Sequence, residues 1–225
     1  MDRTLVSLEK VGRNFSLEGK QVVALTDVTC QVKAGDRIAI IGPSGSGKST
    51  LMALMAQLDE PTEGLVTWPG FGSPERLRPR HVGLAFQSAS LIPSLSVIEN
   101  VEMPLLILGE VQNTRARAMA ALDIVGLPAL ANRLPEEISG GQAQRIGIAR
   151  ALVTDPELIL ADEPTGQLDQ ATAKKLVRAL LAHAKKTGAA LVIATHDHAV
   201  ANQMKSIWRT EHGKLTTNHE VGVAA

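Results

Sequence analysis

Strand-like and helical patterns of apolar residues follow one another along the chain. Residues 5–8 and 22–32 alternate apolar and polar side chains with the period of two that is typical of strands. Continuous apolar runs, which are typical of buried strands, occupy residues 37–41, 158–161 and 190–194. We therefore expect strands at these five segments.

Helical periodicity fills the intervals between several of these strands. A good helix-forming run at residues 50–56 follows the first buried strand, and residues 171–186 form a helical segment between the last two. The pattern is also helical from residue 96 to residue 151, most clearly over 115–124. Because strands separated by helices imply right-handed crossovers, this order predicts an α/β fold with a mainly parallel sheet.

The order of the elements also suggests two lobes. After a predicted strand that ends at residue 86, the helical pattern indicates an inserted helical lobe over about residues 88–155. The sheet lobe then comprises about residues 1–87 and 156–215, and residues 216–225 are expected to form a loose tail. A length of 225 residues fits one domain with such an inserted lobe.

Charge and composition narrow the classes of function. The chain has 23 basic and 23 acidic residues, which disfavours a nucleic-acid binder. Its longest candidate for a membrane segment, residues 103–108, is far shorter than the about 20 apolar residues that a membrane helix needs, and no signal-peptide region follows the first residues. We therefore expect a cytosolic chain that reaches a membrane only through a partner. Cys30, the single cysteine, is predicted to be a small core residue.

A complete phosphate-loop motif, G-x-x-x-x-G-K-S, lies between a predicted strand and a predicted helix. Small residues let consecutive N–H groups wrap an anion. Lys48 would reach the β- and γ-phosphates of a nucleotide, and the Ser49 hydroxyl would ligate Mg²⁺. The residues expected to contact the nucleotide here are Gly42, Pro43, Ser44, Gly45, Ser46, Gly47, Lys48, Ser49 and Thr50.

Two carboxylates, Asp162 and Glu163, follow the apolar run at residues 158–161. In an open α/β sheet, ligands bind beyond the carboxyl ends of the strands. Asp162 would bind Mg²⁺ directly or through water, and Glu163 would polarise the water that attacks the γ-phosphorus. Taken alone, the pair could also be the N-cap of a helix that begins at the end of the strand.

Polar residues follow two further predicted strands. Gln87 could accept a hydrogen bond from a metal-bound water and donate one to a phosphate, although such a glutamine is often a solvated loop residue. His196 follows the strand at residues 190–194 and, taken alone, could simply cap that strand. The other histidines show no ligand spacing and are interpreted as structural: His81, His183, His198, His212 and His219.

The most informative motif is the run Ser139-Gly140-Gly141, which opens a predicted helix. A helix N-terminus with a serine hydroxyl and bare N–H groups can receive a γ-phosphate. Because this run lies on the helical lobe and the phosphate loop on the sheet lobe, one chain is not expected to close both onto one ATP, whereas a head-to-tail pair can. The alternative is a serine N-cap with no ligand.

The order of these motifs resembles the ATP-binding-cassette (ABC) family, and the resemblance covers roughly residues 5–215. It implies a P-loop NTPase fold with a RecA-like mixed sheet core, an antiparallel β subdomain and an inserted helical lobe. It also implies an ATPase that binds ATP and Mg²⁺ and works as a pair, in which each serine–glycine signature completes the ATP site of the other subunit.

The resemblance implies further roles for single residues. Gln87 would bind the metal and sense the γ-phosphate, His196 would contact that phosphate as a switch, and Phe15 would stack on adenine, where the family usually has tyrosine. Asp169 would belong to a loop through which the subunits touch. The signature residues that would reach the partner's ATP are Ser139, Gly140, Gly141 and Gln142.

Residues 86–105 resemble the ATPases of the macrolide-export and lipoprotein-release type, including a relative that serves the cell-division permease. This resemblance implies two partners, which are a four-helix permease with a large external domain and a second copy of the chain. It also implies a position on the cytoplasmic face of the cell membrane. A groove beside Gln87, lined by about residues 88–105, would receive the permease. The stretch 69–80 is shorter and richer in proline and arginine than expected for this type.

Other classes of ATPase share some of these motifs. A DNA-repair or chromosome-tethering ATPase would need a long coiled coil between the phosphate loop and the signature, for which the chain has no room. A translation factor would have two cassettes in one chain, and a P-loop kinase would not need the signature. A soluble ABC ATPase with a non-transport partner, such as an iron–sulfur assembly scaffold, stays open.

Overall fold

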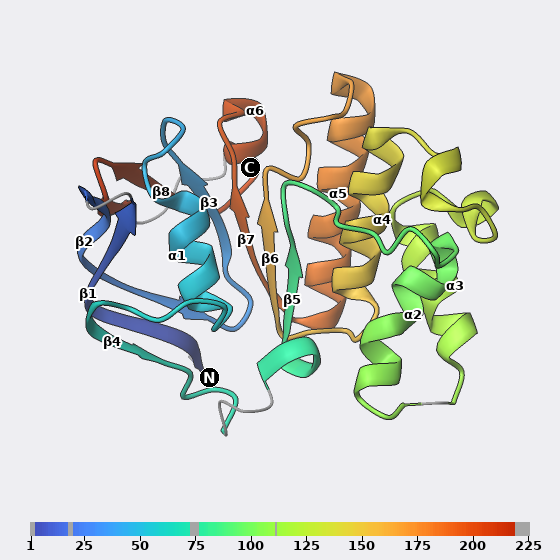
Figure 1. The fold of residues 1–225 in the computed structure, drawn as a ribbon, viewed down its shortest axis with the longest axis horizontal. Coiled ribbons are helices and arrows are strands. Elements are labelled where there is room, and N and C mark those ends of the chain that lie inside the picture. Colours follow the sequence, from blue (N-terminus) through green and yellow to red (C-terminus); the bar gives the residue numbers. More distant parts are fainter. Residues whose placement is uncertain (1–2, 18–19, 73–76, 111, 219–225) are drawn as a thin grey trace. The chain divides into compact units, whose positions relative to one another are not determined.

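The computed structural model describes residues 3–17, 20–72, 77–110 and 112–218. The chain divides into two units: residues 1–77 together with 192–225 form the first, and residues 78–191 form the second. In chain order the elements are β1 (Thr4–Leu17), β2 (Lys20–Lys33), β3 (Arg37–Ile41), α1 (Lys48–Met55), β4 (Glu63–Thr67), η2 (Leu77–His81), β5 (Val82–Ala85), α2 (Val97–Ile107), α3 (Thr114–Ile124), η3 (Pro128–Leu130), η4 (Pro135–Glu137), α4 (Gly140–Leu152), β6 (Leu158–Asp162), α5 (Gln170–Thr187), β7 (Ala190–Ala194), α6 (His198–Ala201), β8 (Ser206–Glu211) and β9 (Lys214–Asn218) (Figure 1).

An antiparallel sheet in the order β2-β1-β4 forms part of the first unit. The predicted strands at residues 5–8 and 22–32 are confirmed and extend further, because β1 and β2 pair along almost their whole lengths. Leu8 pairs with Cys30 on one side and Val66 on the other, and all three side chains are buried. Cys30 is thus a core residue, as predicted, and burial raises the pKa of its thiol to about 12.

The first unit also contains β3, β8 and β9, which are neighbours in that order, and the last three residues of β7, which is the neighbour of β3 on its other side. All five residues of β3 are buried, which explains the apolar run that follows Arg37. Strand β3 runs parallel to β8, and β9 returns antiparallel to β8. The expected mixed sheet is therefore confirmed. Thr216 and Thr217, which were predicted to belong to a loose tail, instead lie in β9 and pair with Arg209 and Trp208 of β8. His219 and the rest of the predicted tail lie outside the described residues.

In the second unit, β5 and β6 pair in parallel and lie side by side (Figure 1). The helical pattern from residue 96 to residue 151 resolves into α2, α3 and α4. The start of α2 is fixed by a capping box between Ser96 and Glu99, and by Asn100, whose fully buried amide bonds to the backbone of Ile92, Leu95 and Ser96. A buried polar side chain satisfied in this way locks the loop in front of the helix.

The two units are cut at other points than the predicted lobes. Strands β5 and β6 and helix α5, which the sequence analysis assigned to the sheet lobe, group with α2, α3 and α4 in the second unit. The lobe boundaries at residues 87 and 156 stay a prediction. None of the described helices combines the length and the apolar character that a crossing of the bilayer requires.

Candidate functional site

The phosphate-loop motif lies in the first unit, between β3 and α1, which is the predicted context. Gly47 is the N-cap of α1 and has a left-handed backbone with φ of 102°. A Cβ atom at Gly47 would lie 2.5 Å from the carbonyl oxygen of Ala24, and one at Gly42 would lie 2.2 Å from that of Thr210. Both positions therefore require glycine, because a methyl group would collide with backbone that cannot move aside.

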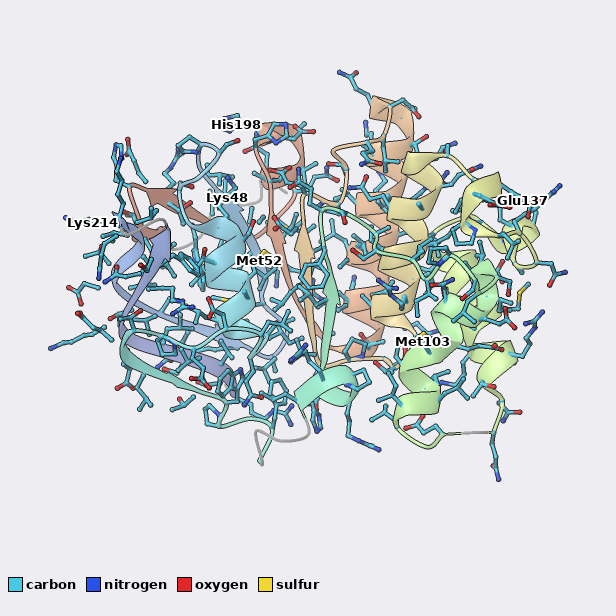
Figure 2. The ribbon with its side chains drawn as sticks, in the orientation of Figure 1. Lys48, Met52, Met103, Glu137, His198 and Lys214 are labelled. Carbon is cyan, nitrogen blue, oxygen red and sulfur yellow. The ribbon has the colours of Figure 1, made fainter. Side chains whose placement is uncertain are left out.

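Lys48 begins α1 and folds its side chain over the loop (Figure 2). Its ammonium donates to the carbonyl oxygens of Gly42 and Pro43 at 2.8 and 2.9 Å, and the residue is 8% exposed. The hydroxyls of Ser46 and Thr210 lie 2.7 Å apart and tie the loop to β8. A fixed positive charge beside a glycine-rich loop at a helix N-terminus is an arrangement that binds phosphate.

His196 lies next to this loop. It lines a cavity of about 390 Å³ together with Gly42 and Pro43, so the structure brings the predicted switch histidine and the phosphate loop together within the first unit. The next residue, Asp197, is the N-cap of α6. Asp197 donates its N–H to the Thr195 hydroxyl and accepts from the N–H of Ala199 at the start of α6.

The paired carboxylates lie at the end of β6 in the second unit. Asp162 is the last residue of the strand and Glu163 follows it, and both are buried, at 7% and 9% exposure. Glu163 has a left-handed backbone with φ of 47°, which is rare for a residue with a side chain. A turn follows it instead of a helix, so the alternative interpretation of the pair as a helix N-cap is wrong.

Gln87 and Asp162 line the same cavity, of about 580 Å³, so the structure brings these two predicted metal ligands together. Amide and carboxylate oxygens are hard donors that suit Mg²⁺, which usually keeps few protein ligands and completes its shell with water and phosphate oxygens. Ser49, the third predicted ligand, lies in the first turn of α1 and offers a hydroxyl oxygen. The three donors fit Mg²⁺ by their chemistry.

The signature residues open α4, as predicted. The hydroxyl of Ser139 accepts from the N–H of Gln142, and the Gln142 side chain accepts from the N–H of Ser139 at 2.7 Å. This capping box satisfies two donors. The N–H groups of Gly140 and Gly141 in the first turn have no acceptor inside the helix, by helix geometry, and are suited to an anion. The serine is thus an N-cap, and binding of a phosphate by the two glycine N–H groups stays a prediction.

Gln144 is a functional candidate that the sequence analysis missed. Its side chain is 3% exposed and bridges α4 to the segment after β6. The amide Nε2 donates to the carbonyl oxygen of Glu163 at 2.7 Å, and Oε1 accepts from the N–H of Gln167 at 3.2 Å. No signal in the sequence sets it apart, because the same helix has other polar residues, Gln142, Arg145 and Arg150.

The turn between β6 and α5 packs closely against the signature glycines. A Cβ at Gly140 would lie 2.6 Å from Oε1 of Gln167, and one at Gly141 would lie 2.9 Å from the carbonyl oxygen of Gln167. Asp169, predicted to lie in a subunit contact, is the N-cap of α5. Hydrogen bonds from Thr172 lower the pKa of its carboxyl, as does the N–H of Ala171.

Phe15, the predicted adenine platform, is a half-buried residue of β1 in the first unit. The guanidinium of Arg13 lies 4.5 Å from the centre of its ring, and Arg13 is itself held by Asp59 at 2.7 Å. This cation–π contact fixes the ring. Stacking of Phe15 on adenine stays a prediction.

The histidines interpreted as structural have varied surroundings. His81 lies 2.9 Å from Glu157, and His183 is buried, 3.8 Å from Asp155. His198 shares the cavity of His196. No group of three His, Cys, Asp or Glu residues in the described part of the chain is arranged to hold a metal ion.

Comparison with known proteins places the same motifs in one family. Residues 25–166 match the family model described as "ABC transporter". The lipoprotein-releasing system ATP-binding protein LolD of Legionella pneumophila (strain Paris) is 42% identical, over 96% of this chain and 98% of that protein. The macrolide export ATP-binding/permease protein MacB of Burkholderia pseudomallei (strain K96243) is also 42% identical, over 96% of this chain but 34% of that longer protein.

A comparison with solved structures agrees with this family match. The dimeric ATP-binding cassette MJ0796, in a post-hydrolysis state bound to ADP and Pi, superimposes with a TM-score of 0.89. It is 35% identical in sequence, and the match covers 97% of this chain and 100% of that one.

Proposed function

The chain belongs to the ABC transporter family, and we propose that it is the ATP-hydrolysing subunit that drives a membrane permease of the export or force-transmitting type. The observation that carries the proposal is the N-terminus of α4, where Ser139 caps the helix and the N–H groups of Gly140 and Gly141 follow it. A phosphate loop alone would indicate only nucleotide binding. A second receptor for phosphate, on another unit of the chain, indicates an ATP site that two subunits complete.

The proposed chemistry is hydrolysis of ATP by in-line attack of water. The phosphate loop and Lys48 hold the phosphates of ATP. Bound Mg²⁺ would be ligated by Ser49, Gln87 and Asp162, and it would offset the negative charge of the phosphates. Glu163 positions and polarises the attacking water. Its main chain is fixed by Gln144, so the carboxylate is placed before the reaction begins, which is the condition for effective electrostatic catalysis.

Control of the reaction comes from two residues beside the phosphates. Gln87, which shares a cavity with Asp162, would report whether a γ-phosphate is present. His196, which shares a cavity with the start of the phosphate loop, would contact that phosphate and hold it during attack. Hydrolysis removes these contacts, so the closed state would lose its stabilisation.

We propose that the active form is a pair of identical chains in head-to-tail arrangement. In the pair, Ser139 and Gly141 of each chain would receive the γ-phosphate of the ATP held by the other. A similar cassette, MJ0796, has a dimeric structure bound to ADP and Pi. Binding of ATP would then close the pair and hydrolysis would open it, which converts chemical energy into motion.

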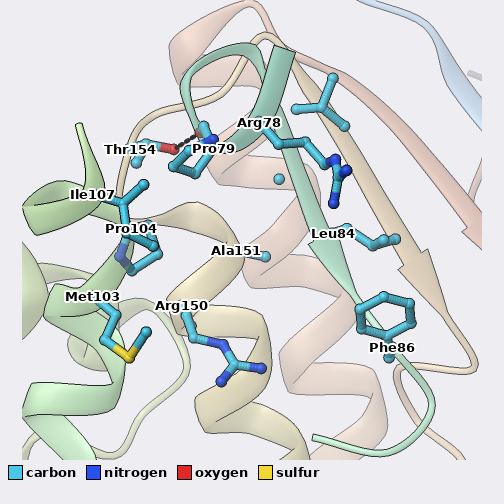
Figure 3. A pocket seen from close by; sticks show the side chains of 12 residues that line it. Arg78, Pro79, Leu84, Phe86, Met103, Pro104, Ile107, Arg150, Ala151 and Thr154 are labelled. Atoms are coloured by element: carbon cyan, nitrogen blue, oxygen red, sulfur yellow. Dashed lines mark hydrogen bonds between the residues drawn. The ribbon is translucent and has the colours of Figure 1, made fainter. Parts of the chain in front are cut away.

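The permease would dock on an exposed apolar cavity of the second unit, and the chain would lie on the cytoplasmic face of the cell membrane through that contact. The cavity, of about 450 Å³, lies between η2, β5, α2 and α4 (Figure 3). Phe86 and Ile107 in its lining are 48% and 66% exposed. Large exposed apolar side chains beside a concave surface are typical of a docking site. The four-helix architecture of the permease is part of this proposal.

The test uses a trapped complex. Tagged E163Q is expressed in the cells from which the chain comes, held with ATP, and purified from gently solubilised membranes, and the co-purifying proteins are identified by mass spectrometry. We expect a permease with a large external domain. The double variant K48A/E163Q is the control, because it should lose ATP binding and the trap. Recovery of soluble proteins alone, in an ATP-dependent manner, would overturn the transport function and favour the soluble-scaffold alternative.

A further inference from the structure

Phe15 lies where the antiparallel sheet of the first unit is irregular. It pairs with Val22 of β2, and the register of the two strands shifts between Val11 and Arg13 and again between Arg13 and Asn14. Phe15 is half-buried and Val22 is exposed, so the ring lies at the surface of the unit. Because irregular pairing re-aims side chains, the orientation of the ring has to be fixed by other groups.

Arg13 supplies that support. Its guanidinium carbon lies 4.5 Å from the centre of the Phe15 ring. The same guanidinium meets both carboxylate oxygens of Asp59: Nε donates to Oδ2 at 2.9 Å, and Nη2 lies 2.7 Å from Oδ1. A two-point pair of this kind fixes the plane of the guanidinium as well as its position. The fixed plane then restrains the ring that lies against it.

Asp59 lies in the segment that follows α1, and this segment is joined to β1 on both sides of Arg13. The N–H of Thr62 donates to the carbonyl oxygen of Gly12 at 2.8 Å, and the N–H of Asn14 donates to the Thr62 hydroxyl at 3.0 Å. Helix α1 begins in the phosphate loop. One stretch of chain therefore connects the loop proposed to hold the phosphates with the group that holds the ring.

The orientation of the ring matters because a base stacks on an aromatic side chain through one face. Such stacking contributes about five- to a hundredfold in affinity. A ring that is free to turn has to be ordered when the ligand binds, and ordering one side chain costs about two- to tenfold in affinity. Arg13 orders the ring before the nucleotide arrives. Because the guanidinium covers one face of Phe15, the base can use only the other face.

We propose that Arg13 is a positioning residue for the nucleotide base: clamped by Asp59, it holds Phe15 in the orientation in which the ring stacks on adenine. This inference rests on the proposed function, which supplies ATP as the substrate. Arg13 contacts the ring, and the phosphate loop holds the phosphates. The contribution of Arg13 to affinity therefore depends on the presence of the base and of Phe15.

Calorimetric titration of the purified chain with ADP and Mg²⁺ tests the inference, because ADP has the base and leaves no γ-phosphate to hydrolyse. R13M keeps an unbranched side chain and removes the charge and the planar fork. We expect it to raise the Kd for ADP about two- to tenfold. F15A should raise the Kd about five- to a hundredfold. The double variant R13M/F15A should match F15A within about 1.5-fold, since no ring is left for Arg13 to hold.

Two controls separate this role from a general effect on the fold. Pyrophosphate has no base, so it should bind R13M as tightly as it binds the wild type. R115M is the matched control, because Arg115 is an exposed arginine of α3 that lies 3.9 Å from Glu102 in the second unit, and its loss should leave the affinity for ADP unchanged.

A second variant at the same position keeps the test available if urea unfolding shows that R13M does not fold. R13K keeps a cation beside Asp59 but loses the rigid fork, so its Kd for ADP should lie between those of the wild type and R13M. R13K and R13K/F15A then supply the same comparison.

Three results would overturn the inference: an unchanged Kd for ADP in R13M, an equal loss with and without Phe15, or weaker binding of pyrophosphate to R13M. The second and third would show that Arg13 supports the fold or the phosphate loop instead of the ring. An affinity for ADP that F15A leaves unchanged would exclude Phe15 as the platform for the base, and the inference with it. These results leave the proposed function in place, which is contradicted separately if the wild type neither binds ADP nor hydrolyses ATP.

Discussion

Replacing Gln144 by methionine keeps the length of the side chain and removes both of its hydrogen bonds. In the wild type, the amide joins the carbonyl oxygen of Glu163 at 2.7 Å and the N–H of Gln167 at 3.2 Å. The Gln144 side chain is 3% exposed and Glu163 is 9% exposed, so water has little access to the Glu163 carbonyl group after the substitution.

The cost in stability follows from what each backbone group retains. A typical hydrogen bond contributes about 1 kcal/mol, and a buried polar group without a partner costs about 1–3 kcal/mol. The Glu163 carbonyl keeps the N–H of Gly166 at 3.1 Å, and Gln167 is an exposed residue. Burial of the more apolar methionine offsets part of the loss. We therefore expect the free energy of unfolding to fall by about 1–2 kcal/mol.

Catalysis should lose more than stability. Glu163 has φ of 47°, a conformation that costs a residue with a Cβ about 1–2 kcal/mol, and the Gln144 amide helps to hold it. A displacement of about 1 Å at a reacting group can cost about a hundredfold in rate. We expect kcat for ATP hydrolysis to fall by about ten- to a hundredfold, while KM for ATP changes by less than about twofold, since the phosphate loop is untouched.

The assay combines steady-state ATPase kinetics with urea unfolding. Q203M is the matched control. Gln203 is exposed, and its side chain donates to the carbonyl oxygen of Ala199 within the same short stretch of chain, so both measurements should match the wild type. Restoration of the rate by Q144E, which keeps one acceptor for Gln167, would indicate that the Gln167 contact matters more. If Q144M lowers stability while kcat stays within twofold of the wild type, the amide does not position Glu163 and the reasoning fails.

Three further predictions concern Glu163, Gly47 and His183. E163Q should bind ATP and form dimers but hydrolyse ATP at least about a hundredfold more slowly, because a general base contributes about 10²–10⁴-fold; near-normal turnover in a phosphate-release assay would exclude the base role. Gly47→Ala should abolish binding of a fluorescent ATP analogue, since the added Cβ would lie 2.5 Å from the Ala24 carbonyl oxygen; retained affinity would contradict the packing of the loop. His183 has a pKa lowered first by burial, against the opposing charge of Asp155, so the unfolded chain binds its proton more readily and stability should decline as pH falls below about 6.5. In H183L that part of the decline should vanish, and an unchanged pH profile of urea unfolding would show that another group is responsible.

Local sequence patterns predicted most elements because their causes are local. All five residues of β3 are buried, four of them apolar, and the same holds for β6, while β7 is apolar and buried throughout. A continuous apolar run was therefore a reliable sign of a strand buried on both faces. The glycines of the phosphate loop were equally predictable from the sequence, because the motif fixes their positions. By contrast, β9 has two adjacent threonines and no apolar alternation, and it becomes a strand through pairing with β8.

What the sequence did not predict depends on contacts between distant segments. The role of Gln144 needs the approach of α4 to the end of β6, which no periodicity encodes. The cavity lined by Arg78 and Arg150 likewise joins residues far apart in the chain. The high content of proline and arginine in residues 69–80 was visible in the sequence. That Arg78 and Pro79 line a cavity together with residues of α2 and α4 was not.

The signature glycines illustrate how one residue type answers two physical demands. As members of the first turn of α4, Gly140 and Gly141 expose N–H groups that are suited to the partner's phosphate. As neighbours of Gln167, they also leave room for its main chain and amide, which a Cβ would approach to 2.9 and 2.6 Å. An alanine at Gly141 would therefore push on the main chain of the turn that follows Glu163 in its own chain, in addition to crowding the phosphate of the other. The test is a mixed dimer in which one chain carries G141A and the other carries E163Q with an intact signature. Only the chain with the alanine then has a competent base, and its ATP meets the intact signature, so we expect impaired hydrolysis if the alanine acts through the turn.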